Sequence, residues 1–251
     1  MVDRDHLITY LDDLLQSNSV KDYAPNGLQV SGKHQINKIC TAVSAGSAIL
    51  DQAVAADADL LLVHHGYFWK GEPNTVLGIR QKRLKTLLAN DLNLCAYHLP
   101  LDIHLELGNN AALAKLLQVE GIEAHAVQGV NNLLWSGNFV DSISPSALSD
   151  FLEQKLQKPL HLTADKKSIY KIAWCSGAAQ DFIEQAALLG VDAYISGEVS
   201  ERTFYLAKEL NVHYFACGHH ATERYGIQAL GDHICELFAI EHTFLDIENP
   251  V

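Results

Sequence analysis

The chain has 251 residues, of which 48% are hydrophobic and 19% are charged, and its formal net charge is −12 at pH 7. This length allows one large α/β domain or two small ones with real cores. Without an apolar run of about 18 residues, no transmembrane helix is expected, and the N-terminus has no signal-peptide pattern. The acidic balance also disfavours general nucleic-acid binding, because such a surface repels the phosphate backbone.

The five cysteines occur singly and without CxxC spacing, which is typical of reduced, buried thiols in a reducing compartment. Cys217 lies two residues before His219, so it is a candidate metal ligand. We favour the simpler interpretation that it is a small buried hydrophobic residue at a strand end.

Helices and strands alternate through the first half of the chain. Apolar spacing predicts them in the order helix 5–16, strand 38–43, helix 47–56, strand 59–65, helix 80–90, strand 92–98 and helix 111–117. Ser44 or Ser47 can cap the helix 47–56, and Asn109 or Asn110 the helix 111–117. The first strand–helix–strand unit should cross over with a right hand.

Two features of this half allow more than one interpretation. The loop 67–77 is rich in aromatic and turn-forming residues and follows a histidine pair, so it could be a lid or a packed surface loop. Residues 78–85 hold four cations on roughly two helical turns, and we interpret them as a solvated helix face.

The second half of the chain repeats the first. Residues 171–178 align with 38–45, and without a gap Asp192–Glu198 falls on Asp59–His65. The strand 211–217 would then correspond to 93–99. A duplication is the favoured explanation, although two units of one structural class can also resemble each other. Two halves, 1–125 and 126–251, are therefore expected. The later elements are strands and turns over 127–141, a helix over 146–155 and a last strand over 244–247.

His64 and His65 close an apolar run that reads as a buried parallel strand. In open α/β sheets, ligands bind outside the carboxyl ends of the strands, and imidazole is the commonest metal ligand. Neighbouring strand residues point to opposite faces, so both rings reach one volume only if the strand bends, which Gly66 permits. The alternative is one histidine bonded in the core and one in solvent.

Two other strand ends offer similar side chains. Asp102 follows the strand 92–98, with His98 nearby, and His219 follows a strand of the second half. Glu223 lies four residues after His219, on the same helical face, and His220 starts a second such pair. Each signal alone arises often by chance, but their common position at strand ends gives them weight.

A mixed set of imidazoles and carboxylates suits Zn, Mn, Fe, Co or Ni. Five candidates exceed the three protein ligands of a typical catalytic zinc and suit two divalent ions bridged by a carboxylate and a water. These candidate ligands are His64, His65, Asp102, His219 and Glu223. Glu223 is the expected bridge, and His98 and His220 are expected to orient the ligands or to transfer protons.

Four segments, 23–30, 63–66, 97–102 and 218–223, resemble the NIF-three-like family, whose bacterial members are known as GTP cyclohydrolase 1 type 2 homologues. The resemblance covers the whole chain and is close to the short enterobacterial form. It implies two similar intertwined α/β halves, layered α/β/α with mixed sheets, and a dinuclear metal site in the cleft between them. The family's ligands correspond to the five residues named above.

The resemblance also implies a cytoplasmic, ring-shaped homohexamer built as a trimer of dimers, and a solution mass near that of one chain would contradict it. The leading functional hypothesis is a metal-dependent hydrolase of a small molecule, GTP cyclohydrolase-like, with metal-bound water as nucleophile. The purine specificity rests on the resemblance, since no phosphate-binding GxxxxGK[ST] loop is present. The alternatives are a non-catalytic metal-handling or interaction ring and, against the acidic charge, a ring that binds nucleic acid.

Overall fold

The computed structural model describes residues 1–251 and divides into two compact units. Unit 1 comprises residues 1–101 and 226–248, and unit 2 comprises residues 102–225 and 249–251. Each unit is built on its own mixed sheet with helices, so the expected mixed α/β fold class is confirmed. None of the helices is both long enough and apolar enough to cross a membrane.

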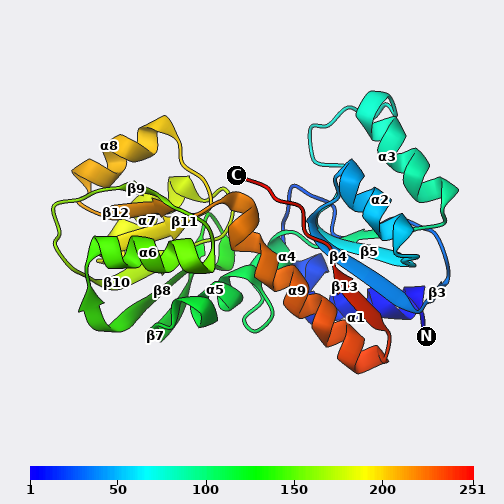
Figure 1. The fold of residues 1–251 in the computed structure, drawn as a ribbon, viewed down its shortest axis with the longest axis horizontal. Helices are drawn as coiled ribbons and strands as arrows, with labels where there is room; N and C mark the ends of the chain where they lie inside the picture. Colours follow the sequence, from blue (N-terminus) through cyan, green and yellow to red (C-terminus); the bar gives the residue numbers. More distant parts are fainter. The chain divides into compact units, whose positions relative to one another are not determined.

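Unit 1 contains a five-stranded sheet in the order β13-β4-β5-β6-β2 (Figure 1). Its strands are β13 (Glu241–Phe244), β4 (Lys38–Ser44), β5 (Leu60–His65), β6 (Asn93–Ala96) and β2 (Gly27–Val30). All are parallel except β2, which runs antiparallel to β6. Two short strands, β1 (Val2–Asp3) and β3 (Gln35–Ile36), form a separate antiparallel pair.

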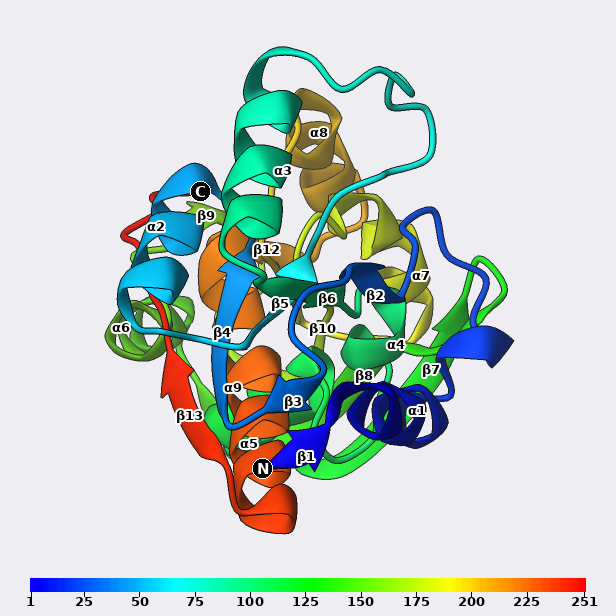
Figure 2. The same cartoon turned by 90° about the vertical axis from the view of Figure 1, so that its right-hand side faces the viewer.

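Unit 1 contains five helices or parts of helices and one 3-10 turn. They are α1 (Arg4–Leu15), the 3-10 turn η1 (Ser17–Ser19), α2 (Ser47–Ala55), α3 (Gly78–Ala89), α4 (Leu99–Asp102), which ends in unit 2, and the later turns of α9 (His219–Phe238). One cluster joins Leu61 and Val63 of β5 to Leu50 of α2 and Leu87 of α3. Figure 2 shows α2 and α3 side by side over the sheet.

Unit 2 contains a six-stranded sheet in the order β7-β8-β10-β11-β12-β9. Its strands are β7 (Glu120–Val127), β8 (Val130–Ile143), β10 (Ile169–Trp174), β11 (Ala193–Ser196), β12 (His213–Ala216) and β9 (Leu160–Leu162). Its helices are α5 (Asn109–Leu117), α6 (Pro145–Lys155), the 3-10 turn η2 (Gln180–Phe182), α7 (Ile183–Leu188), α8 (Glu201–Glu209) and the first turns of α9. Apolar residues of α5 and α6 pack on one face of this sheet.

The internal repeat is visible in the strand register. Ile39 of β4 pairs with Leu60 of β5, and Ile172 of β10 pairs with Ala193 of β11, as the ungapped alignment requires. For the third strand of each repeat, β6 and β12, the predicted alignment is wrong. Leu60 pairs with Asn93 and Ala193 with His213, so these third-strand positions correspond, two residues away from the expected match of 93 with 211.

An aspartate makes the same set of hydrogen bonds in each repeat, Asp59 in unit 1 and Asp192 in unit 2. The Oδ2 atom of Asp59 accepts hydrogen bonds from the backbone N–H groups of residues 37 and 38, and Asp192 Oδ2 accepts from those of residues 170 and 171. A lysine pairs with the other oxygen, Lys33 at 2.7 Å and Lys166 at 2.9 Å. These bonds outweigh burial, which alone would raise the pKa, and hold the pKa of both carboxyls below the usual value.

The boundaries between the units differ from the expected division at residue 125. Helix α5 and strand β7 belong to unit 2 because β7 pairs along β8 and α5 packs into the same core. The later turns of α9 belong to unit 1, where Tyr10 of α1 stacks on His233 at 5.9 Å, and β13 pairs with β4. The last strand, β13, therefore begins three residues before the predicted range 244–247 and overlaps it only at Phe244.

The predicted helix caps are wrong. Gly46 precedes α2 and Gly108 precedes α5, and neither provides a capping side chain. Asn109 is fully buried and donates to the carboxylate of Asp102 instead. A sequence pattern cannot distinguish an asparagine that caps a helix from one recruited by a buried carboxylate.

His161 of β9 is held in a setting that disfavours its protonation. Its Nε2 atom lies 3.0 Å from Nδ1 of His213, and its ring stacks on Phe215 at 4.2 Å. Burial, with added repulsion from His213 and Lys208, lowers the pKa of His161 to about 4.

The unfolded state should therefore bind a proton at this site more readily than the folded state between pH 6.5 and 4. The stability is fully present above pH 6.5 and is lost as the pH falls through this window. Because the ring is partly exposed, we expect a loss on the order of 1 kcal/mol between about pH 7 and 5. Urea unfolding of His161→Phe should show a smaller loss than the unchanged chain, whereas His34→Gln, at an exposed position, should not. Equal losses in all three proteins would contradict this.

Candidate metal centre

Three imidazoles of unit 1 come together where β5 ends. Leu60–Val63 are fully buried, and His64 and His65 follow with ring centroids 4.5 Å apart. His98, which follows β6, brings a third ring, and one nitrogen of each of the three rings lies within 4.8 Å of the others. Both adjacent histidines therefore reach one small volume, as two ligands of one metal site would have to.

Each of these rings is oriented through its Nδ1 atom. His64 Nδ1 donates to the backbone carbonyl of Tyr97 at 2.9 Å, and His65 Nδ1 is hydrogen-bonded to Ser44 Oγ at 2.9 Å. His98 Nδ1 lies 3.0 Å from Asp22 Oδ1. An oxygen partner on one ring nitrogen directs the other nitrogen away from it, and this pattern is usual for histidines that ligate metals.

Gly66 contributes in a different way from the one expected. Its φ is not positive, so the strand does not need glycine for its conformation here. A Cβ atom at this position would lie 2.2 Å from Gln29 Oε1 and 2.7 Å from Ala96 Cβ. Gln29 Oε1 also accepts from the N–H of Tyr67 at 2.7 Å. Glycine is needed because β2 and β6 pack closely against the backbone at this point.

Asp22 is the partner that fixes His98, and it was missed in the sequence. Burial would raise the pKa of this carboxyl, but the hydrogen bond and charge of His98, with bonds from Asn26 and the backbone, lower it to about 2. Asp22 also accepts from the backbone N–H of Leu99 at 3.0 Å. The only indication in the sequence is that Asp22 directly precedes the segment 23–30, which carries part of the family resemblance.

Unit 2 gathers the acidic candidates. Asp102 ends α4 and Glu223 lies in the first turns of α9, and an oxygen of one carboxylate lies within 4.8 Å of an oxygen of the other. Glu223 Oε2 is 3.1 Å from His219 Nε2, the i,i+4 pair expected from the spacing. Asp102 Oδ1 accepts from Asn109 Nδ2 at 2.9 Å and from Ser176 Oγ at 3.0 Å. The second half therefore offers one imidazole and two oriented carboxylates.

Glu198 completes the environment of His219. Its Oε1 atom lies 2.7 Å from His219 Nδ1, which repeats the pattern of unit 1. Burial would lower the pKa of His219, but the bonds and charges of Glu223 and Glu198 raise it to about 9. In the ungapped repeat alignment Glu198 occupies the position of His65, so the alignment itself was the signal for this residue.

Gly177 lies directly against the pair His219 and Glu223. Its φ is +64°, and a Cβ atom there would lie 2.2 Å from Glu223 Oε1 and 3.1 Å from His219 Nε2. The loop after β10 can therefore approach the two side chains only because residue 177 has no side chain.

Two remaining candidates have different surroundings. The backbone N–H of His220 donates to the carbonyl of Val251 at 3.0 Å, and His220 is in none of the groups of three side chains that could hold a metal ion. Cys217 is fully buried, its thiol points to the carbonyl of Phe215 at 3.9 Å, and burial raises its pKa. The interpretation of Cys217 as a buried small residue is thus favoured over ligation.

The donor atoms in both units fit a borderline transition metal rather than calcium or magnesium. Unit 1 offers three imidazoles, and unit 2 offers one imidazole with two carboxylates. Buried carboxylates with hydrogen-bonded oxygens and histidines with an occupied Nδ1 are typical of metal sites. The five predicted ligands all lie in these two sets.

Comparison with known proteins agrees with these observations. The family model Duf34/NIF3 (NGG1p interacting factor 3) matches residues 2–250. A relative from Yersinia pestis is 49% identical over 246 residues, covering 97% of this chain and 98% of its own. One from Escherichia coli (strain K12) is 47% identical over 243 residues, 96% of each chain. Both carry the name GTP cyclohydrolase 1 type 2 homolog.

Solved structures show the same fold over the whole length. Protein ybgI, of unknown function, superposes with a TM-score of 0.95 at 45% identity, and TTHA1606 from Thermus thermophilus with 0.91 at 32%, each covering 100% of both chains. The family resemblance read from four short segments is therefore confirmed, and this chain belongs to the Duf34/NIF3 family.

Proposed function

We propose that His64, His65, Asp102, His219 and Glu223 jointly hold two divalent transition-metal ions, and that the protein is a metal-dependent hydrolase of a small molecule. The observation that carries this proposal is that hydrogen bonds orient four of the five candidate ligands. Three histidines are held through Nδ1, and Asp102 is held through a carboxylate oxygen. A stability role alone would not require four separate oxygen or amide partners that fix the ring or carboxylate direction.

When bound, two such ions supply Lewis-acid polarisation of a substrate oxygen and a water that ionises near neutral pH. The chain's own residues would do the rest. Glu223 is 3% exposed and lies near both Asp102 and His219, so it is the carboxylate best placed to serve two ions. Glu198 keeps His219 oriented, and Asn109 and Ser176 keep the Asp102 carboxylate from turning.

His98 is our choice for proton transfer. Asp22 holds its Nδ1 atom, as a carboxylate holds the histidine of many acid–base pairs, and the remaining nitrogen lies in the imidazole cluster. Trp69 covers His98 with ring centroids 5.0 Å apart, and Tyr23 lies 4.9 Å away on the same ring. These aromatic rings would limit the access of bulk water to the transferring group.

The second candidate function is metal handling without catalysis, because the same ligand set can store or deliver an ion. A carrier should release its metal readily to a chelator, whereas a hydrolase should retain it through turnover. The name of the relatives makes GTP the first substrate to test for hydrolysis.

Glu223→Gln should lower the metal content of the purified, metal-reconstituted protein from two ions per chain to one or fewer, because the amide loses the charge shared by both sites. Elemental analysis after gel filtration measures this directly. Glu236→Gln removes an exposed charge from the same helix and should leave the content at two. A full complement of metal in Glu223→Gln would contradict the proposed bridge.

Gly177→Ala should also lose metal, because the added methyl group displaces the carboxylate of Glu223. Gly190→Ala is the matched control. Gly190 has a similar φ of +72° with no atom within 4 Å of an added Cβ, so it shares the backbone cost of about 1 kcal/mol without the clash. Metal loss in Gly177→Ala alone supports the site, and equal loss in both variants would assign the effect to backbone strain.

Incubation of the metal-loaded protein with GTP should release formate and bleach the purine absorbance, and His98→Gln should slow the reaction by about 10²-fold or more. Glu223→Gln should abolish it. If the unchanged protein shows no turnover above Glu223→Gln, the cyclohydrolase version is rejected. Rapid loss of the ions to a chelator would then favour the metal-handling alternative.

A further inference from the structure

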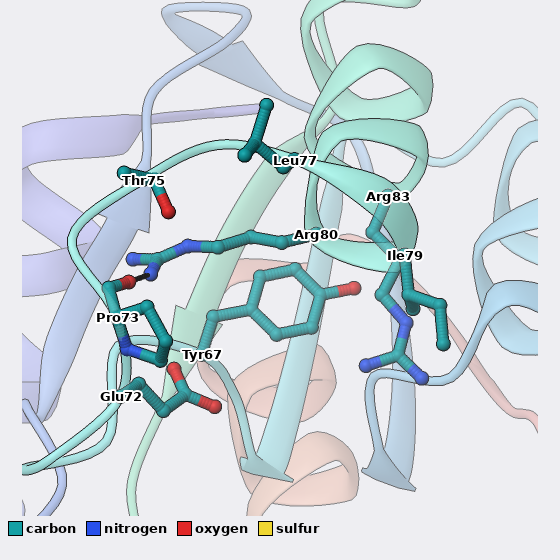
Figure 3. A pocket seen from close by; sticks show the side chains of 8 residues that line it. All are labelled: Tyr67, Glu72, Pro73, Thr75, Leu77, Ile79, Arg80 and Arg83. Carbon is teal, nitrogen blue, oxygen red and sulfur yellow. Dashed lines mark hydrogen bonds between the residues drawn. The ribbon is translucent and has the colours of Figure 1, made fainter.

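A cavity of about 350 Å³ lies in unit 1 between the loop 67–77 and the first turns of α3 (Figure 3). We call it the α3 pocket. Its volume is at the lower end of the range for small-molecule sites, so it can hold a compact organic molecule. None of its lining residues is among the candidate metal ligands.

Two arginines line the α3 pocket. Figure 3 shows the side chain of Arg80 passing along the ring of Tyr67 toward Pro73, while the guanidinium of Arg83 lies near the hydroxyl end of the ring. Arg80 donates to the carbonyl of Pro73, and its guanidinium lies 4.8 Å from the ring centroid of Phe68. The guanidinium of Arg83 lies 5.7 Å from the ring centroid of Tyr67. The rings and the loop hold both groups in place.

Neither arginine forms an ion pair with a carboxylate, and the Nε atoms of both are buried without a hydrogen-bond acceptor. Glu72 also lines the pocket, but its carboxylate accepts from the backbone N–H of Trp69 at 3.2 Å. Buried donors normally have partners, and guanidinium groups bind carboxylate and phosphate oxygens through paired N–H bonds. The pocket thus combines two fixed cations with unused donors in a chain of net charge −12.

The rest of the lining is aromatic and apolar. Tyr67 is 7% exposed, its hydroxyl donates to the carbonyl of Ala45 at 2.7 Å, and burial raises its pKa to about 12, so it remains neutral. Leu77 and Ile79 are exposed apolar residues at the pocket's edge, 72% and 66% accessible. A purely inorganic anion would leave these surfaces in water, whereas an organic body would cover them.

We infer that the α3 pocket binds a small organic oxyanion: a carboxylate or phosphate group, held by Arg80 and Arg83, attached to a flat or apolar body that packs on Tyr67. This changes the interpretation of the basic run 78–85. Lys82 and Lys85 differ from the arginines in their surroundings, because only Arg80 and Arg83 line the pocket.

Calorimetric titration of the full chain, stripped of metal by a chelator, tests this with four probes. Benzoate and phenylphosphonate carry an oxyanion on a ring, benzyl alcohol has the ring without the charge, and inorganic phosphate has the charge without the ring. At least one of the first two should bind about tenfold or more tightly than both controls. The stronger of the two identifies carboxylate or phosphate as the preferred group.

Arg80→Gln/Arg83→Gln should weaken this binding at least about tenfold, whereas Lys82→Gln/Lys85→Gln removes the same charge from the same helix and should change it less than about twofold. If the arginine variant does not fold, Arg80→Lys/Arg83→Lys keeps the charge and should still weaken binding several-fold, because the paired donors are lost. Equal effects of the arginine and lysine variants, equal affinity for benzyl alcohol, no oxyanion binding at about 10 mM, or binding only after metal is restored would each overturn the proposal. The last result would assign the anion to the metal centre.

Discussion

The parallel pairing of β5 with β6 fixes the chemistry of the histidine cluster. Leu60 lies opposite Asn93 and Val63 opposite Ala96, so the next residue along, His64, meets the backbone of Tyr97. The N–H of Tyr97 donates to the carbonyl of Val63 at 3.0 Å, and the carbonyl of Tyr97 accepts from His64 Nδ1. The register of two buried strands therefore occupies Nδ1 of His64, and Nε2 is the nitrogen that would ligate a metal in the proposed site.

The duplication supplies this arrangement twice, with different side chains. The repeat of each unit has three parallel strands. In each, an aspartate, Asp59 or Asp192, accepts hydrogen bonds from the backbone at the start of the first strand. At the strand end, however, His64 and His65 of unit 1 are matched by Gly197 and Glu198 of unit 2. The same backbone thus presents mainly imidazoles in one unit and carboxylates with one imidazole in the other.

Much of this was predictable because it depends on local patterns. The apolar runs, the helical spacing and the His219–Glu223 interval identified the central strands, α9 and the candidate ligands. The features that depend on packing between distant segments could not be predicted. The partner of His98, Asp22, lies 76 positions away in a segment without regular structure, and no periodicity marks it. The unit boundaries depend on which sheet β7 and β13 join, and sequence spacing leaves that open.

The arginines of α3 show the same limit. A cluster of cations on a short helix usually indicates a solvated face, and Lys82 and Lys85 lie outside the pocket lining. Arg80 and Arg83 are three positions apart and so share one face of the helix, which the loop 67–77 covers. The path of that loop decides which cations of α3 line the pocket, and no sequence periodicity predicts that path.

The loop after β10 bears on the ion selectivity that the proposed metal site would have. The carbonyl of Gly177 accepts from the N–H groups of Gly197 and Glu198, at 2.9 and 3.2 Å, and its own N–H donates to Thr222 Oγ1 at 3.0 Å. The backbone of this loop is thereby already ordered, so an ion held at the proposed site would not have to order it at an entropic cost. A rigid metal site adapts poorly to ions of the wrong radius, so these three bonds would make the proposed site selective for ion size.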